Sequence, residues 1–411
     1  MSHQNFIRIG QTLSLMLVFV FFTAACNKKD AEPTLKEPAL KGNPIDKNVT
    51  VETRALLNNL KALSSKHLLF GHQDDLAYGV NWIDEDGRSD VKDVSGAYPA
   101  ITGWEIGGLD IGNEANLDRV NFDNMEKWIK DVYSRGGINT ISWHMFSPVN
   151  GKNSWSGGDT VSKIIPGGEF HDKFKSYLDT YVEFNKKLVT TDASGKEVHI
   201  PIIFRPWHEH NGDWFWWSKG HTAEEDYVAL WKFTVEYLRD THQQHNLVYA
   251  FSPDRSRMNI DNFREDYLWG YPGDDYVDII GFDNYHDLKP GENAEDQAKK
   301  LASLISSLQG VATIAQEKNK LAALSEGGSD GIANPQFWTD VLLAAMQHDE
   351  LTRQIAYVVV WRNANKAIEE RDHFYAPYPG HPSAENFREF YNSPYVLFND
   401  GLHNIYTPGA F

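Results

Sequence analysis

Residues 205–217 combine ionisable side chains with four tryptophans directly after an apolar run. The run, residues 199–204, is short and β-branched, which predicts a buried parallel strand that ends at this segment. An acid among indole rings is partly removed from water, so its pKa rises and Glu209 can hold a proton at neutral pH. Aromatic faces also stack on the apolar faces of sugar rings. The segment therefore indicates a carbohydrate site with Glu209 as proton donor, whereas the plainer alternative is a core histidine beside exposed acids.

Glu326 is a second carboxylate that follows an apolar run, and a glycine pair comes after it. Glycines allow backbone and ligand to approach closely. Two-carboxylate glycoside hydrolysis needs one acid to protonate the leaving oxygen and one carboxylate to attack the anomeric carbon. The chain must therefore bring Glu209 and Glu326 together from positions far apart in the sequence.

Eight apolar runs, spaced by about 40 residues, predict the strands that would do this. They are residues 67–72, 101–106, 138–145, 200–207, 247–252, 277–285, 321–325 and 355–361. Amphipathic stretches between them predict helices at residues 124–134, 171–188, 223–241, 296–318 and 335–347. The expected fold is α/β, a (β/α)8 TIM barrel in which residues 49–411 form one catalytic domain.

In such a barrel, chemistry gathers at the carboxyl ends of the strands. Polar or aromatic residues follow every predicted strand, and the ends of the fourth and seventh strands face each other across the mouth. Helix capping explains Asp74 and Asp254 equally well. It does not explain Trp143, Trp361 and Glu326 together.

Composition limits the substrate. The formal net charge is −18, and the lysines and arginines do not cluster, which argues against nucleic acid. Aromatic residues make up 13% of the chain, more than a core alone needs, so some of them should face a ligand. A neutral substrate fits this balance.

The first 25 residues read as a lipoprotein signal peptide. Arg8 precedes the apolar run 13–22, and the sequence Thr-Ala-Ala-Cys ending at Cys26 resembles a lipobox, with Thr23 in place of the more usual leucine. Cys26 is the sole cysteine, which favours lipidation over a disulfide, although an ordinary cleaved signal is the alternative. Residues 26–48 would be a tether. We expect a monomer on the cell envelope of a Gram-negative bacterium, whose lipid anchor is its only membrane contact.

Four stretches carry a family resemblance: RPWHEHNGDWFWW at residues 205–217, GFDNY at 281–285, LSEGG at 324–328 and VVVWRNA at 358–364. They resemble glycoside hydrolase family 26, whose best-known members are retaining β-1,4-mannanases. The resemblance covers essentially the whole predicted domain. It implies a (β/α)8 barrel, Glu209 as acid/base, Glu326 as nucleophile and no cofactor.

The resemblance also implies roles for other residues. His208 would contact the sugar at the −1 subsite, Trp214 would line the reaction centre, and Tyr285 would hold the nucleophile. The remaining residues expected to bind sugar are His144, Arg205, Asp283, Trp361 and Arg362.

Several alternatives stay open. The family also contains enzymes that act on xylan and mixed-linkage β-glucan, and the segments 79–98 and 150–168 could wall the cleft so that mannobiose is released from chain ends. His208, His210, His144 and Asp283 could instead hold a metal in a barrel hydrolase. A non-catalytic glycan-binding lipoprotein is the remaining alternative.

Overall fold

The computed structural model describes residues 44–192, 194–369 and 371–411. The predicted signal peptide, Cys26 and most of the predicted tether lie outside the described residues. Within the part that is described, no helix has the length and apolar character needed to cross a membrane.

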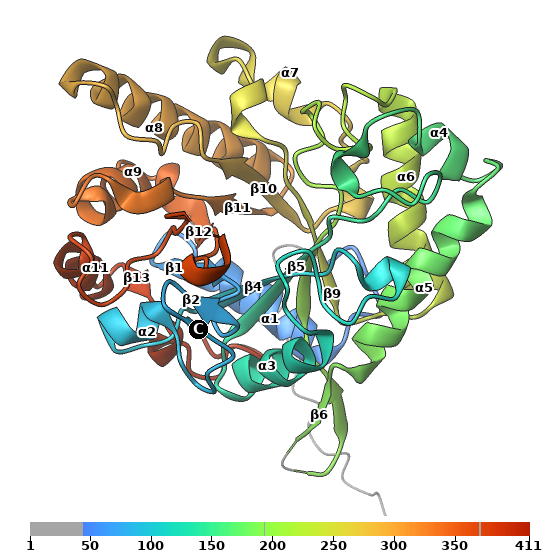
Figure 1. Cartoon of the computed structure of the whole chain (residues 1–411), viewed down its shortest axis with the longest axis horizontal. Helices are drawn as coiled ribbons and strands as arrows, with labels where there is room; N and C mark the ends of the chain where they lie inside the picture. The colour runs from blue at the N-terminus through green and yellow to red at the C-terminus, as the bar shows by residue number, and fades with distance from the viewer. Residues whose placement is uncertain (1–43, 193, 370) are drawn as a thin grey trace, which may run out of the picture. The chain divides into compact units, whose positions relative to one another are not determined.

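Eight parallel strands close into a barrel. Their order in the sheet is β12, β11, β10, β9, β8, β5, β4 and β1, and β12 pairs with β1 to complete the circle. Helices surround the strands (Figure 1). The strands are β1 (Leu68–Gln73), β4 (Ile101–Glu105), β5 (Ile138–Ser142), β8 (Ile202–Arg205), β9 (Leu247–Phe251), β10 (Ile279–Asn284), β11 (Leu321–Gly327) and β12 (Ile355–Val360). The predicted (β/α)8 barrel is confirmed.

The fourth barrel strand, β8, is shorter than predicted because prolines flank it. Pro201 and Pro206 have no N–H to donate to a ladder, and β8 lies between them. The residues before Pro201 pair elsewhere: β7 (Glu197–His199) forms an antiparallel hairpin with β6 (Val189–Thr191). Two further short pieces, β2 (Tyr78–Gly79) and β3 (Trp82–Ile83), form a second hairpin, and β13 (Val396–Leu397) adds to β1.

The five predicted helices are present with small shifts in their bounds. Two of them contain π-helical turns: Tyr237–Thr241 continues the sixth helix, and Phe337–Leu343 leads into the ninth. The helices are α1 (Val51–Leu63), α2 (Asp90–Ser95), α3 (Phe122–Ser134), α4 (Val161–Ile164), α5 (His171–Lys187), α6 (Glu224–Glu236), α7 (Phe263–Leu268), α8 (Ala294–Glu317), α9 (Ala344–Met346), α10 (Lys366–Glu369) and α11 (Ala384–Tyr391). Short 3-10 turns occupy Leu109–Ile111, Ser154–Ser156, Arg255–Arg257, Ile260–Asn262, Asp274–Tyr276, Asp330–Ile332, Thr352–Gln354 and Asn399–Gly401.

Helix α1, which the sequence patterns did not predict, covers the amino-terminal end of the barrel. Thr50 caps it by accepting a hydrogen bond from the Thr53 N–H, and its leucines pack on residues at the strand starts. The Asn59 side chain donates to the carbonyl groups of Ile405 and Thr407, at 2.7 and 2.8 Å. One end of the barrel is thus closed, and the carboxyl ends of the strands lie at the other.

Candidate active site

Glu209 sits in a loop with unusual backbone geometry at the end of β8. Trp207 and Glu209 both have positive φ angles, 53° and 51°, a conformation that costs free energy for residues other than glycine. Neighbouring groups hold the loop in place: the Glu209 N–H donates to the Ser252 carbonyl at 2.7 Å, and the Tyr227 hydroxyl donates to the Trp207 carbonyl at 2.9 Å. The loop therefore presents Glu209 in a fixed position at the strand end.

Glu326 lies near the end of β11 and is held by two donors. The Tyr285 hydroxyl donates to Glu326 Oε1 at 2.7 Å, and Arg205 Nη2 donates to Oε2. Hydrogen bonds from two donors fix the orientation of a carboxylate. A carboxylate held in this way is suited to act as a nucleophile.

Asp283 faces Glu326 across the β10–β11 pair, and its side chain is fully buried. It accepts hydrogen bonds from Arg205 Nη1 at 2.8 Å, from the Ser252 hydroxyl at 2.5 Å and from the Ser325 hydroxyl at 3.1 Å. Arg205 and Asp283, which the sequence predicts to bind sugar, are buried and bonded to each other, and their contact with sugar stays a prediction. Arg205 bridges Asp283 and Glu326 and so fixes the position of the Glu326 carboxyl group.

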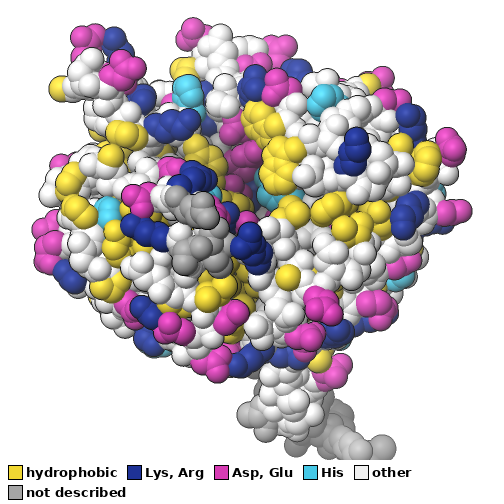
Figure 2. Space-filling model, viewed as in Figure 1, with side chains coloured by type: hydrophobic (Ala, Val, Ile, Leu, Met, Phe, Trp, Pro, Cys, Tyr) yellow, Lys and Arg dark blue, Asp and Glu magenta, His cyan; other side chains and the backbone are white. Residues whose placement is uncertain are grey.

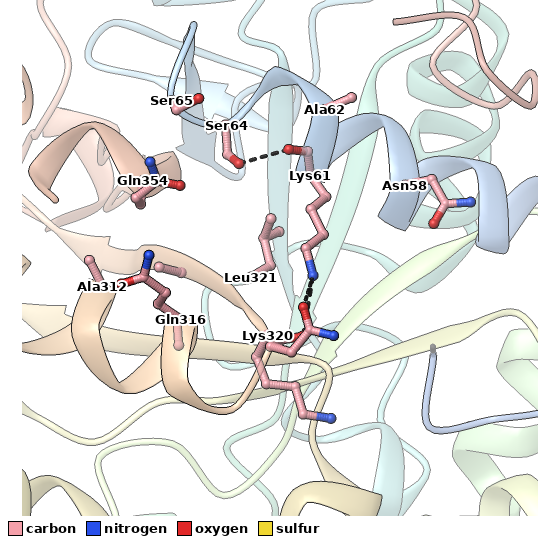
Figure 3. A pocket seen from close by; sticks show the side chains of 13 residues that line it. Asn58, Lys61, Ala62, Ser64, Ser65, Ala312, Gln316, Lys320, Leu321 and Gln354 are labelled. Carbon is pink, nitrogen blue, oxygen red and sulfur yellow. Dashed lines mark hydrogen bonds between the residues drawn. The ribbon is translucent and has the colours of Figure 1, made fainter. Parts of the chain in front are cut away.

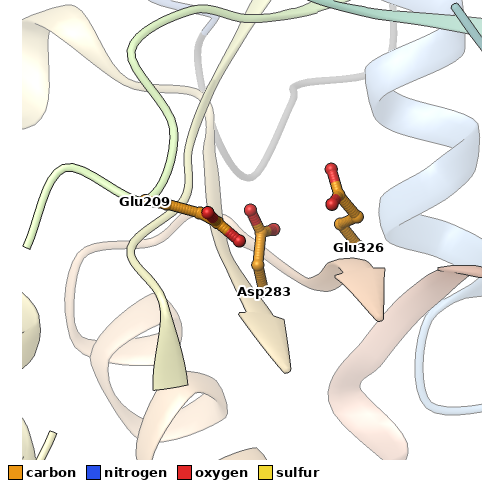
Figure 4. A group of neighbouring side chains, drawn as sticks. All are labelled: Glu209, Asp283 and Glu326. Carbon is orange, nitrogen blue, oxygen red and sulfur yellow. The ribbon is translucent and has the colours of Figure 1, made fainter. Parts of the chain in front are cut away.

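One carboxylate oxygen from each of Glu209, Asp283 and Glu326 lies within 4.8 Å of the other two. Figure 4 shows the Glu209 and Asp283 side chains pointing toward one another, with Glu326 projecting from the end of β11. Catalytic carboxyl groups about 5–5.5 Å apart are typical of retaining glycosidases, and inverting enzymes need about 6.5–9.5 Å to admit a water molecule. The approach of these oxygens places Glu209 and Glu326 near enough to act on one glycosidic bond.

The surroundings of Glu209 favour its protonated form. Burial raises the pKa of Glu209 well above its ordinary value, and the negative charges of Asp254, Asp283 and Glu326 raise it further. A hydrogen bond from Trp214 Nε1 to Glu209 Oε2, 2.7 Å long, opposes this shift. Burial also raises the pKa of Asp283 to about 8, although Arg205 opposes the change. Glu209 can therefore carry a proton at neutral pH.

His144 and His208 lie edge to face with ring centroids 4.6 Å apart. Glu105, at the end of β4, accepts from His144 Nδ1 at 2.7 Å. Burial lowers the pKa of His144, but the charge and hydrogen bond of Glu105 outweigh it, so the net shift is upward. Burial, Arg205 and His144 lower the pKa of His208 well below its ordinary value. The neighbours of the two rings thus shift the pKa of His144 upward and that of His208 downward.

Trp155 belongs to the same surface, but the sequence analysis did not single it out. Its side chain is 52% exposed and stacks on His144, with centroids 5.0 Å apart and planes 14° from parallel. The sequence signal that could have identified Trp155 is a tryptophan within a loop rich in glycine and serine. An exposed indole beside two histidines is suited to stack on a sugar ring.

Trp361 and Arg362 follow β12 next to the nucleophile strand, since the Trp361 N–H donates to the Gly327 carbonyl at 2.9 Å. Arg362 Nη2 pairs with Asp118 at 3.0 Å and with Glu369 at 2.7 Å. Both side chains are partly exposed. Trp361 therefore follows β12 beside the end of β11, while the Arg362 guanidinium is held by Asp118 and Glu369.

His210 points away from this centre. It is fully buried, its Nε2 lies 3.1 Å from the Trp269 carbonyl, and its ring stacks on Tyr227. The predicted alternative of a metal held by His208 and His210 requires both rings on one side. Within residues 44–192, 194–369 and 371–411, the cluster whose ligand atoms lie together is the carboxylate trio of Glu209, Asp283 and Glu326.

Two of the hollows on the surface of the described residues bear on where the site lies. Figure 2 shows one near the middle of the viewed face, with acidic side chains inside it and hydrophobic and histidine side chains at its border. The other, about 530 Å³, lies between α1, the end of α8 and the start of β11 (Figure 3). There Lys61 Nζ is bound to Asn319 Oδ1 at 2.6 Å. The second hollow lies beside the first residues of β11, away from Glu326.

Comparisons with known proteins agree with this geometry. Residues 45–327 match the family described as Glycosyl hydrolase family 26. A mannan endo-1,4-beta-mannosidase of Bifidobacterium adolescentis is 31% identical over 374 residues, which cover 86% of this chain and 36% of that protein. The chain thus spans about a third of that relative's length. A mannan endo-1,4-beta-mannosidase of Bacillus subtilis strain 168 is 28% identical over 310 residues, covering 71% of this chain and 77% of that protein.

Solved structures of similar proteins superpose on this chain as well. The GH26 beta-mannanase BoMan26A from Bacteroides ovatus superposes with a TM-score of 0.78 at 37% identity, covering 88% of this chain and 99% of that one. A modular endo-beta-1,4-mannanase from Cellulomonas fimi superposes with a TM-score of 0.77 at 32% identity, covering 89% of this chain and 79% of that one. With its closed barrel and paired glutamates, this chain belongs to glycosyl hydrolase family 26 and is a glycoside hydrolase.

Proposed function

We propose that the protein is a retaining, endo-acting β-1,4-mannanase that cleaves mannan, galactomannan and glucomannan backbones. The observation that carries the chemistry is the approach of Glu209 and Glu326, whose carboxylate oxygens lie within 4.8 Å of each other. The substrate rests on the names of the relatives from Bifidobacterium adolescentis and Bacillus subtilis and on the mannanase structures that superpose on the barrel.

In the first step, Glu326 attacks the anomeric carbon of the −1 sugar while protonated Glu209 gives its proton to the glycosidic oxygen. The bond between the anomeric carbon and that oxygen breaks, and the leaving sugar departs with the proton. Arg205 and Tyr285 hold Glu326 in line for this attack. His144, His208 and Trp155 border the place where the −1 sugar would lie.

In the second step, Glu209 accepts a proton from water, and the water oxygen attacks the anomeric carbon and displaces Glu326. The change of role follows from charge. Glu326 is neutral while it is esterified, so its contribution to the raised pKa of Glu209 disappears and Glu209 can act as a base. Two displacements at one carbon retain its configuration.

Two variants test the assignment. Glu326→Ala removes the nucleophile and should lower kcat on mannan by several orders of magnitude while manno-oligosaccharide binding persists. Glu209→Ala should lose activity on mannan but retain more on aryl mannosides, because a good leaving group does not need protonation. Near-normal rates of both variants on mannan would show that the two glutamates are not the catalytic pair.

The same enzyme assayed on mannan, xylan and mixed-linkage β-glucan tests the substrate. We expect reducing ends from mannan, with products of several lengths at early times. Mannobiose alone at early times would indicate action at chain ends, and faster cleavage of xylan or β-glucan would replace the mannan assignment. Tight binding without new reducing ends would identify a binding protein.

We also infer that Cys26 is lipidated and that residues 26–48 tether a monomeric enzyme to the cell envelope of a Gram-negative bacterium. The inference is supported by the apolar run 13–22 and by the position of the sole cysteine directly after it. Such a tether would keep the anchor apart from the barrel.

A further inference from the structure

Arg257 lies beside the acid/base glutamate, on the loop that follows β9. Its guanidinium carbon is 5.0 Å from the ring centroid of Trp214, within the range of a cation–π contact. The Nε1 of the same Trp214 donates to Glu209 Oε2 at 2.7 Å. One indole therefore connects Arg257 to the carboxyl group that protonates the leaving oxygen.

The arrangement of Arg257 and Trp214 is fixed by two further contacts. Asp213 Oδ1 accepts from Arg257 Nη2 at 2.6 Å. Gly212 allows the indole to lie against the backbone, because a Cβ at this position would come 2.6 Å from the Trp214 ring. The side chains of residues 213, 214 and 257 thus form one small platform, which we call the Arg257 platform.

The guanidinium of Arg257 keeps donors available. Arginine has five N–H groups in a planar fork, and among the residues that the structure describes only Asp213 accepts a hydrogen bond from Arg257. Its side chain is 44% exposed. The remaining N–H groups can therefore reach the hydroxyl groups of a bound sugar.

The position of Glu209 determines which sugars these are. A general acid protonates the oxygen that joins the −1 sugar to the leaving chain, so the leaving sugars lie on the side of Glu209 from which the proton is given. Trp214 contacts that carboxyl group, and Arg257 covers the face of Trp214. The Arg257 platform therefore borders the leaving-group side of the cleft, whereas Trp361 and Arg362 follow a strand beside the nucleophile.

We propose that Arg257 is a specificity-determining residue that binds the leaving sugars through hydrogen bonds to their hydroxyl groups. The proposal rests on the proposed function and extends it to one side of the cleft. Because the guanidinium occupies the face of Trp214, recognition there depends on directional hydrogen bonds more than on ring stacking. Arg257 should accordingly influence where a manno-oligosaccharide is cut.

The test compares Arg257→Ala with a matched control, Arg264→Ala. Arg264 is also an exposed arginine with one ion pair, 2.5 Å to Glu317, which joins α7 to the end of α8. Each variant is assayed on mannopentaose, which supplies leaving sugars, and on an aryl β-mannobioside, which supplies none. Loss of one or two hydrogen bonds to a charged group should reduce kcat/KM of Arg257→Ala for mannopentaose about 10-fold more than that for the aryl substrate.

A second measurement on the same variants is the cleavage pattern of mannopentaose hydrolysed in ¹⁸O-labelled water. Arg257→Ala should shift cleavage away from bonds that place two sugars on the leaving side. Arg257→Lys, which keeps the charge but loses the planar fork, should fall between wild type and Arg257→Ala. Arg264→Ala should follow the wild type in both measurements.

Equal effects of Arg257→Ala on the two substrates, or an unchanged cleavage pattern, would overturn the proposal. Turnover of mannopentaose by the wild type tests the proposed function itself, and the ratio between variant and wild type tests the role of Arg257. A failure of the proposed function and a failure of the proposed role of Arg257 therefore give different results in one set of assays.

Discussion

Glu209 and Glu326, the proposed catalytic pair, differ in the charges and donors around them. Glu326 receives hydrogen bonds from Arg205 and Tyr285, while Glu209 receives one from Trp214 and lies among other acids. The neighbours of Glu209 raise its pKa and favour its protonated form, while the two donors fix the Glu326 carboxyl group in place. The assignment of nucleophile and acid thus follows from the neighbours of each residue.

Asp254 allows a test of how neighbouring charges set the pKa of Glu209. It is the largest source of negative charge that raises the pKa of Glu209, ahead of Asp283 and Glu326. Asp254→Asn removes this charge, so the pKa of Glu209 should fall and the alkaline limb of kcat/KM should move to lower pH. A pH profile on mannopentaose measures the shift. A limb that stays in place or moves to higher pH would contradict the account.

Tyr285→Phe removes one of the two donors to Glu326 and leaves the ring in place. A hydrogen bond to a charged group contributes about 1.5–3 kcal/mol, so kcat should fall roughly 10- to 100-fold. KM for mannopentaose should change little, because the hydroxyl contacts the enzyme's own carboxylate. Steady-state kinetics checks this, and unchanged kcat would show that the bond does not support attack.

Among the single residues of the site, Glu209 and Glu326 could be predicted from the sequence because each follows an apolar run that is typical of a strand. The sequence could not show that Arg205 and Asp283 turn inward, since their partnership spans 78 positions and depends on the closed barrel. It also missed Trp155, which becomes part of the surface only when its loop folds onto His144.

Among the elements, strands β10 and β11 contain an irregularity that shapes the site. Phe282 pairs with Leu324, but Asp283 pairs with Glu326, so Ser325 is an extra residue on β11. Such a bulge re-aims the side chains next to it. Ser325 then donates to Asp283 at 3.1 Å. The apolar run predicted the strand, but pairing between two strands decides whether a bulge forms, and a single sequence does not display it.

Helix α1 precedes the first strand, so it lies outside the alternation of strands and helices from which the other helices were predicted. Its leucines at positions 56, 60 and 63 do have helical spacing. Their partners are residues at the strand starts and near the end of the chain. The role of the helix therefore depends on contacts between distant segments.

Asn59→Ala tests whether α1 stabilises the barrel. The substitution leaves the carbonyl groups of Ile405 and Thr407 without these donors, which should lower the free energy of unfolding by about 1–3 kcal/mol. The midpoint of urea unfolding measures the loss. Because Asn59 lies at the end opposite the cleft, kcat of the folded variant should match the wild type. An unchanged midpoint would show that α1 is not fastened through Asn59.

For the whole molecule, barrel closure explains how residues from five strand ends reach one centre. Arg205, Ser252, Asp283, Glu326 and Trp361 follow or end β8, β9, β10, β11 and β12, neighbours in the sheet. The regular spacing of apolar runs was enough to predict this closure. Loop conformation could not be predicted, because loops such as 150–168 are held by contacts that only the folded chain provides.

The proposed anchor leads to a prediction about the whole chain. Cys26→Ala removes the thiol that would carry the acyl chains, so the variant should move from the membrane fraction to the soluble fraction of a Gram-negative host. Its specific activity should not change, because the tether separates the anchor from the barrel. Fractionation with activity assays checks both points. Soluble, fully active wild-type enzyme that lacks a lipid by mass spectrometry would contradict the anchor.

The central claim, that Glu326 attacks sugar directly and Glu209 supplies the proton, is tested most directly by the stereochemistry of the first product. Proton NMR during hydrolysis of manno-oligosaccharide should show the β-anomer first, with the α-anomer growing only by mutarotation. An initial α-anomer would contradict the account, because it requires a water molecule between carboxylates about 6.5–9.5 Å apart.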